Sequence, residues 1–471
     1  MDTGKSLPPL LRMNAYAGSG GAPAEGPLGG EARKWTLKNA PPGVRTFLRA
    51  EPNADPRDWR DPRVGWGLVL PHNPALDDAA AASAADAPEP IRALVDSRGH
   101  GGRPAPVLRY IAAEGHFGFL RRDGADLPVS QSLHGLGEAA VPRYLLIYAR
   151  PDQVPWQVQY SLNATRCVGR LALEGDALEN YVNALMNDWR SPHQGGADPK
   201  AALVWAADHG PQDITALMRQ AIAAPLAACL RGDRAIGPGT VYLDGAAADG
   251  NGGAATAARL IEGLARARPV YVVSTSHGMT GPLEDPARMA AQLGLPVDND
   301  FAVLEPARLL AAWRPGGAIW YAHACCSAGS DAVSLFGRLL DPASPANQIL
   351  EGVARCGARV APLPQALLGA PDPLRAFVGH VEPTFNWTLE QPETKQYTTD
   401  PLVGALYNEL FQPMPVGLAL QRVYGQLGGL YVDYEHYLRI PSQAQMLYRL
   451  LVARDIQSTV ILGDPTVTLP V

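Results

Sequence analysis

Short apolar runs alternate along most of the chain with longer segments whose apolar residues recur at helical spacing. The runs at 144–149 and 202–207 are short, apolar and bounded by turn-forming residues, which is typical of buried strands. Further runs of this kind lie at 106–113, 240–245, 269–276, 317–324, 376–381 and 458–463. Segments with helical spacing lie at 177–189, 214–230, 255–267, 285–294, 305–313, 330–340, 401–411 and 416–428. This alternation predicts an α/β fold in which helices cover a mainly parallel sheet.

The alternation continues on both sides of residue 195, which predicts two α/β subdomains, at 105–195 and 196–471. Residues 1–104 differ, because they are rich in Pro, Gly, Ala and Asp and show weak periodicity, as at 18–32 and 76–90. That composition predicts an irregular N-terminal region with long loops.

Composition and charge narrow the classes of function. Apolar residues make up 46% of the 471 residues, and the formal net charge is −6. A mildly acidic chain without Lys/Arg runs gives no indication of a nucleic-acid or anionic-membrane partner. No stretch approaches the ~18 consecutive apolar residues of a membrane span, and the first residues lack the apolar run of a signal peptide.

The cysteines indicate a reducing environment. The chain has five of them, an odd and small number for its length, which does not suit a disulfide framework. A soluble, cytoplasmic protein with free thiols is therefore expected. Cys167, Cys229 and Cys356 lie within strand or helix patterns and are expected in the core.

Two predicted loops carry reactive side chains directly after buried strands. His277 and Gly278 follow the run 269–276, and Cys325 with Cys326 follows the run 317–324. The carboxyl ends of parallel strands share one edge of a sheet, and ligands bind there. The cysteine follows the histidine by 48 residues, which leaves room for a helical crossover between the two strands. We therefore expect the imidazole and the thiol to meet.

This pair suits nucleophilic catalysis. A thiolate is a good nucleophile, and a neighbouring imidazole can take the thiol proton and later protonate a leaving amine. The resulting tetrahedral intermediate needs N–H donors for its oxyanion. The backbone N–H groups of Gly278 and Cys325 are the expected donors. The motifs of phosphate loops, zinc peptidases and serine hydrolases are absent from the sequence, and no metal or cofactor is expected.

An apolar strand ending in His-Gly, followed downstream by an apolar strand ending in Ala-Cys, resembles the caspase-type cysteine peptidases, a group that includes gingipains and the bacterial CHAT proteins. The resemblance is closer to the gingipain type than to caspases proper, because His323 stands where caspases have Gln before Ala324-Cys325. Segments 143–171, 376–388 and 460–469 also resemble that group, so the resemblance spans about 105–471.

The resemblance implies a caspase-like three-layer α/β/α sandwich with the catalytic residues in 196–471. It implies a cysteine endopeptidase that acts on protein or peptide substrates, with Cys325 as nucleophile and His277 as general base and acid. Bacterial relatives often serve antiviral defence or programmed death, so control by an activating partner or by self-processing is expected. The alternative is a catalytically idle scaffold or binding module of the same fold.

Other histidines and cysteines are alternatives to this pair. His-Gly also occurs at His100, His134 and His209, of which only His209 follows a predicted strand. Cys326 is the alternative nucleophile. His323 and His380 lie near the same sheet edge; His323 is expected to be a core residue, and His380 is a possible neighbour of the cleft.

A substrate pocket for a basic residue requires a carboxylate. The candidates are Asp244, Asp249, Asp331 and Glu382. Each has an ordinary alternative as a helix cap or a solvated loop charge, and Asp331 stands where a first-turn carboxylate would favour a helix. The sequence therefore favours cleavage at basic residues of the substrate but does not identify the carboxylate that would bind them.

Overall fold

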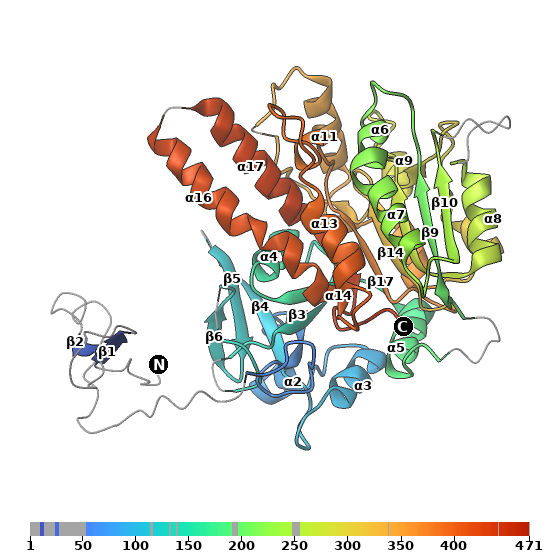
Figure 1. The fold of residues 1–471 in the computed structure, drawn as a ribbon. Helices are drawn as coiled ribbons and strands as arrows, with labels where there is room; N and C mark the ends of the chain where they lie inside the picture. Colours follow the sequence, from blue (N-terminus) through green and yellow to red (C-terminus); the bar gives the residue numbers. More distant parts are fainter. Residues whose placement is uncertain are drawn as a thin grey trace. The chain divides into compact units, whose positions relative to one another are not determined.

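The computed structural model describes residues 10–13, 24–27 and 53–470, apart from gaps at 114–115, 131–132, 138–139, 191–195, 247–254, 338 and 441. The chain divides into two units, Met1–Asn53 and Ala54–Val471. In the first unit, β1 (Leu10–Met13) pairs antiparallel with β2 (Ala24–Pro27). The second unit contains all the other described elements (Figure 1).

A sheet of 12 strands forms the centre of the second unit within the described residues. One half consists of parallel strands in the order β10-β9-β11-β14-β17. Their bounds are β9 (Asp198–Ala206), β10 (Gly239–Asp244), β11 (Pro269–Thr275), β14 (Ile319–His323) and β17 (Ala376–His380). Every residue of β11, β14 and β17 is buried, which explains why these strands appear in the sequence as continuous apolar runs.

The other half contains parallel strands in the order β8-β7-β3-β4, extended at the edge by the antiparallel β5 and β6. Their bounds are β3 (Trp66–Pro71), β4 (Val107–Ala113), β5 (His116–Arg122), β6 (Ala125–Pro128), β7 (Tyr144–Tyr148) and β8 (Cys167–Leu171). β18 (Thr459–Gly463) joins the halves, antiparallel to β17 and parallel to β8. The two parallel sets therefore run in opposite directions, and their carboxyl ends lie at opposite edges.

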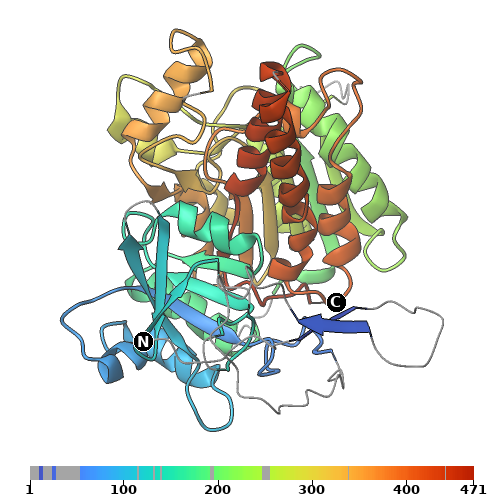
Figure 2. The ribbon, with the colours of Figure 1, turned by 90° about the vertical axis from the view of Figure 1, so that its left-hand side faces the viewer.

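Helices cover both faces of the sheet, so that the fold is α/β with a large, mostly parallel central sheet, as predicted (Figures 1 and 2). The described α-helices are α2 (Asp78–Ala82), α3 (Glu89–Ser97), α4 (Trp156–Asn163), α5 (Gly175–Met186), α6 (Ile214–Met218), α7 (Ala224–Gly232), α8 (Ala257–Ala267), α9 (Pro286–Gln292), α10 (Pro306–Ala312), α11 (Pro345–Arg355), α12 (Pro362–Leu368), α13 (Asp400–Gly404), α14 (Val416–Ala419), α15 (Gln421–Tyr424), α16 (Gln426–Arg439) and α17 (Gln443–Ser458). The last two form an antiparallel pair, drawn in red (Figure 1).

The expectation that 1–104 forms an irregular region is wrong for the part that begins at Ala54. β3 lies inside the sheet between β7 and β4, and α3 buries Ile91, Leu94 and Val95. The apolar run of β3 was obscured by the Pro-, Gly- and Ala-rich segments that flank it. A strand of six residues becomes stable here because two neighbours supply its ladder of hydrogen bonds.

The helix predicted over 330–340 is also wrong, because the described residues from Asp331 to Leu340 form bends, turns and irregular backbone. The carboxylate of Glu382 accepts hydrogen bonds from Ser334 Oγ at 2.5 Å and from the Leu335 N–H at 3.0 Å. Phe336 is fully buried. Contacts with a distant loop thus outweigh the helical spacing of this segment.

Candidate active site

The ends of β11 and β14 bring the predicted histidine and cysteine to neighbouring positions. The strands are parallel with Thr275 opposite His323. His277, which opens the short strand β12 (His277–Gly278), and Cys325 each lie two residues beyond this pair. Adjacent strands are about 4.8 Å apart. The register therefore places the two residues side by side at the carboxyl edge of the sheet.

The backbones of the two loops are in direct contact at Gly278. A Cβ atom added to this glycine would lie 1.9 Å from the Cys325 carbonyl oxygen and 3.0 Å from the Cys325 nitrogen. Only a residue without a side chain permits this approach. Within the described residues, the Cys325 N–H donates to no backbone carbonyl. This N–H therefore has no part in the backbone pairing of the sheet and lies beside the thiol, where an oxyanion-binding group is needed.

Asp213 is the third member of the site and was not predicted from the sequence. Its Oδ2 lies 3.0 Å from His277 Nε2, while Oδ1 caps α6 by accepting from the Thr215 N–H at 2.8 Å. A carboxylate only accepts, so Nε2 carries the proton and the neutral ring keeps its lone pair on Nδ1. Burial raises the pKa of Asp213, but hydrogen bonds from Thr215 and His277 outweigh it, and the net pKa is lowered. In the sequence, Asp213 stands directly before the helical segment 214–230, a position typical of a helix cap, and nothing local links it to His277.

Cys325 is partly exposed, and its Sγ accepts a hydrogen bond from the Thr384 N–H at 3.4 Å. Burial raises the pKa of the thiol, and the Thr384 N–H offsets only part of that rise. Burial therefore favours the thiol over the thiolate. Such a thiol needs a base to become nucleophilic, which is the chemistry that an imidazole supplies.

The neighbouring cysteine points into the protein. Cys326 adopts a left-handed backbone with φ of 56°, which turns the chain sharply after Cys325. Its side chain is fully buried in an apolar cluster with Met289, Leu293 and Val353. Burial raises its pKa well above the ordinary value. Of the two adjacent thiols, only Cys325 is accessible.

Three other histidines lie near this edge. His209 follows β9 and stacks between Phe301 and His277, with ring centroids 4.2 and 5.3 Å away. His323 is buried, and its Nδ1 forms a hydrogen bond of 2.8 Å with the Tyr321 hydroxyl. Burial lowers the pKa of His323 to about 4. His380 is also buried and packs edge-on against His323 at 4.7 Å. His209 therefore belongs to the site's surroundings, and the other two belong to the core.

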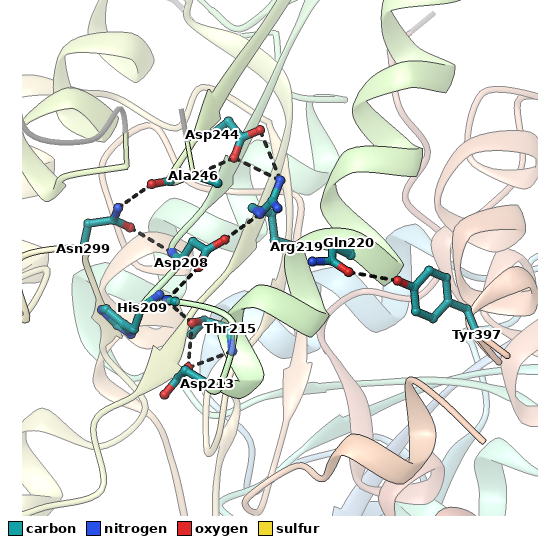
Figure 3. A network of polar contacts seen from close by, with 12 residues as sticks. Asp208, His209, Asp213, Thr215, Arg219, Gln220, Asp244, Ala246, Asn299 and Tyr397 are labelled. Atoms are coloured by element: carbon teal, nitrogen blue, oxygen red, sulfur yellow. Dashed lines mark hydrogen bonds and ion pairs between the residues drawn. The ribbon is translucent and has the colours of Figure 1, made fainter. Parts of the chain in front are cut away.

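The predicted pocket carboxylates are mostly engaged in contacts of their own. Asp244 shares Arg219 with Asp208, at 3.4 and 2.7 Å (Figure 3). Asp331 accepts from Gln157 Nε2 at 2.6 Å and from the Ala332 N–H at 2.7 Å.

Glu382 is buried beneath the segment it holds, and burial raises its pKa to about 7. Asp249 lies outside the described residues. The structure thus brings Asp244, but not Asp331 or Glu382, into the network around Asp208 and His209 (Figure 3).

Comparison of the chain with models of known families and with curated proteins found no match. Among the described helices, none is long and apolar enough to cross a membrane.

Proposed function

We propose that the chain is a cysteine endopeptidase in which Cys325 is the nucleophile and His277 the general base and acid. One observation carries the proposal. A partly exposed thiol and an imidazole occupy matched positions past two adjacent parallel strands, and Asp213 holds the imidazole in the tautomer that has its lone pair on Nδ1. Asp213 is a positioning residue in this scheme.

The reaction steps use these groups in turn. His277 Nδ1 takes the Cys325 proton, and the thiolate attacks the peptide carbonyl carbon, whose oxygen becomes negatively charged. The N–H groups of Gly278 and Cys325 would stabilise that oxyanion. His277 then gives its proton to the leaving amine as the C–N bond breaks and a thioester remains. Water, deprotonated by His277, hydrolyses the thioester and restores the thiol.

The charges near His277 favour a basic substrate residue. Asp208, Asp213 and Asp244 lie at this edge. Asp208 and Asp244 share one cation, Arg219. One guanidinium leaves an excess of negative charge. A positively charged side chain entering the site would compensate for it.

The proposal extends to a regulated, cytoplasmic enzyme of the defence or cell-death type. The described cysteines are all free thiols, which suits a reducing compartment. In this proposal an activating partner or self-processing controls the enzyme. An idle scaffold would carry the same residues without turning over a substrate.

The experiment compares the full-length protein with Cys325→Ala under reducing conditions. Both are incubated alone and with a peptide library, and the products are identified by mass spectrometry. We expect cleavage by the wild-type protein, preferentially after Arg or Lys, and a loss of at least about 100-fold in Cys325→Ala.

Cys229→Ala is the matched control, because Cys229 is a partly exposed thiol on α7 away from the site. It should cleave like the wild type. Equal cleavage by wild type and Cys325→Ala would refute the proposal, and absence of cleavage by all three proteins would favour the scaffold.

A further inference from the structure

Three side chains of metal-ligating type converge beside the proposed nucleophile. His209, Asp213 and His277 each offer one ligand atom, and these atoms lie within 4.8 Å of one another. His209 and Asp213 come from the loop after β9, where Figure 3 shows them close together, and His277 comes from the end of β11. The proposed reaction uses two of these residues and has no role for His209.

The His209 ring has a lone pair without a partner. Its Nε2 lies 2.8 Å from the Asp298 carbonyl oxygen, which can only accept, so Nε2 carries the hydrogen. The neutral ring then keeps its lone pair on Nδ1. This atom is buried and has no hydrogen-bond partner among the described residues. Buried polar atoms in native proteins are seldom unpaired, and each exception calls for an explanation such as an ion.

The donor set selects a class of ion. Two imidazole nitrogens and one carboxylate oxygen suit Zn²⁺ and the neighbouring divalent transition metals, whereas Ca²⁺ and Mg²⁺ prefer oxygen ligands. In a tetrahedral site with bonds of about 2.0–2.2 Å, ligand atoms are roughly 3.4 Å apart. His277 Nε2 and Asp213 Oδ2 are already 3.0 Å apart. Closing a separation of 4.8 Å, the upper limit within the group, to that value requires a shift of about 1.4 Å.

We propose that His209, Asp213 and His277 form an inhibitory site for Zn²⁺, with the fourth position open to water. The inhibitory role rests on the proposed peptidase function, whereas binding of the ion does not depend on it.

Inhibition follows from which nitrogen binds the ion. Zinc at Nε2 requires that atom to release its proton, and the ring then carries its proton on Nδ1 instead. That nitrogen no longer has a lone pair for the Cys325 proton. The ion also takes the place of the hydrogen bond to Asp213. Zinc would thus remove the base without touching the nucleophile.

The binding experiment uses protein that cannot cleave. Zn²⁺ is titrated calorimetrically into full-length Cys325→Ala and into the same protein carrying His209→Gln. Co²⁺ serves as a spectroscopic probe of tetrahedral coordination. We expect one site per chain and at least tenfold weaker binding in His209→Gln, since a ligand should matter no less than the outer-shell residues that change affinity 10–100-fold.

Two further variants keep the result interpretable. His209→Phe preserves the stack between Phe301 and His277 but removes the nitrogen, so it should also lose the site. His436→Ala, on α16, is the matched control and should bind like its parent. The inference is overturned if His209→Gln and His209→Phe bind zinc as tightly as their parent, or if Cys325→Ala itself abolishes binding, which would assign the ion to the thiol.

The activity arm separates the two proposals. Micromolar Zn²⁺ should inhibit wild-type cleavage reversibly, and a chelator should restore it. If wild type cleaves nothing while zinc binds at the His209 site, the peptidase proposal fails and the metal site stands. If a chelator abolishes cleavage and zinc restores it, the ion is catalytic and the inhibitory role is refuted.

Discussion

Asp213 determines which ring nitrogen of His277 carries the proton. One carboxylate oxygen receives the His277 Nε2–H, and the other caps α6. The same side chain thus serves local helix stability and tautomer selection. Because these contacts use different oxygens, a substitution can alter one and keep the other.

Asp213→Asn separates these two roles. Asn is as good a helix cap as Asp, so the free energy of unfolding should change by less than about 0.5 kcal/mol. With the amide oxygen kept on Thr215, the NH₂ group faces His277 Nε2 and favours the tautomer with the proton on Nδ1. We expect kcat to fall by about 100-fold or more, since general-base catalysis contributes roughly 10²–10⁴.

The measurement is the pH profile of peptide cleavage beside denaturant unfolding of the same variant. A purely structural role would lower stability and activity together. An unchanged kcat in a stable Asp213→Asn protein would contradict the assignment.

At the scale of elements, the site depends on how β11 and β14 end. Parallel pairing holds up to Thr275 and His323, after which both chains turn away from the sheet. Contact between the two turns is made where Gly278 meets Cys325. The loop geometry therefore requires glycine at position 278 because a side chain would collide with the Cys325 backbone, and not because of a positive φ.

Gly278→Ala should disrupt this contact. Its Cβ would meet backbone atoms that cannot move aside as a flexible side chain would, so we expect a loss of roughly 1–3 kcal/mol in the free energy of unfolding and loss of cleavage. Gly429→Ala is the matched control, because that glycine lies inside α16 with no atom within 4 Å of the added Cβ.

The control should be neutral or gain about 0.5–1 kcal/mol, since Ala favours a helix interior over Gly. Chemical denaturation of the two variants checks both values. Wild-type stability in Gly278→Ala would show that the two turns are not tightly packed.

At the scale of the whole molecule, the last long helix holds the loop that contacts Cys325. Asp455, near the end of α17, is buried and accepts from the Phe385 N–H at 3.0 Å and from Thr388 Oγ1 at 2.8 Å. The adjacent Thr384 N–H donates to the Cys325 thiol. The C-terminal part of the chain thus fixes a loop whose Thr384 contacts Cys325, 59 positions earlier in the sequence.

This arrangement makes stability depend on pH. Burial raises the pKa of Asp455 to about 7, so the folded state holds a proton that the unfolded state releases near the ordinary pKa of 3.8. The contribution of this group is therefore complete below that ordinary value and is lost as pH rises through about 7. His323 and His380 act in the opposite sense, because burial lowers their pKa and favours folding at higher pH.

Asp455→Asn isolates the first effect. The stability of the variant relative to wild type should rise by roughly 2–4 kcal/mol between pH 5 and pH 8, since the amide cannot ionise. Denaturant unfolding at several pH values measures the difference. Asp123→Asn, at a position whose side chain is 74% exposed, should give a flat difference. A flat difference for Asp455→Asn as well would refute the buried proton.

By itself, the sequence determined the α/β class and the eight strands marked by continuous apolar runs, and it predicted His277 and Cys325 as a pair. These follow from local patterns, since buried strands are apolar and parallel strands end at one edge, although β10, at the edge of the sheet, is only partly buried. The structure adds that Cys326 is buried, which leaves Cys325 as the accessible thiol.

Tertiary structure alone decided the rest. β3 is a strand because β4 and β7 pair with it. The predicted helix around Leu335 does not form, because the Leu335 N–H donates to the Glu382 carboxylate. Asp213 and His209 joined the site because β9 lies beside β11, a pairing that their own surroundings in the chain do not encode. Periodicity reports which face of a segment is buried, whereas strand order determines which distant side chains meet.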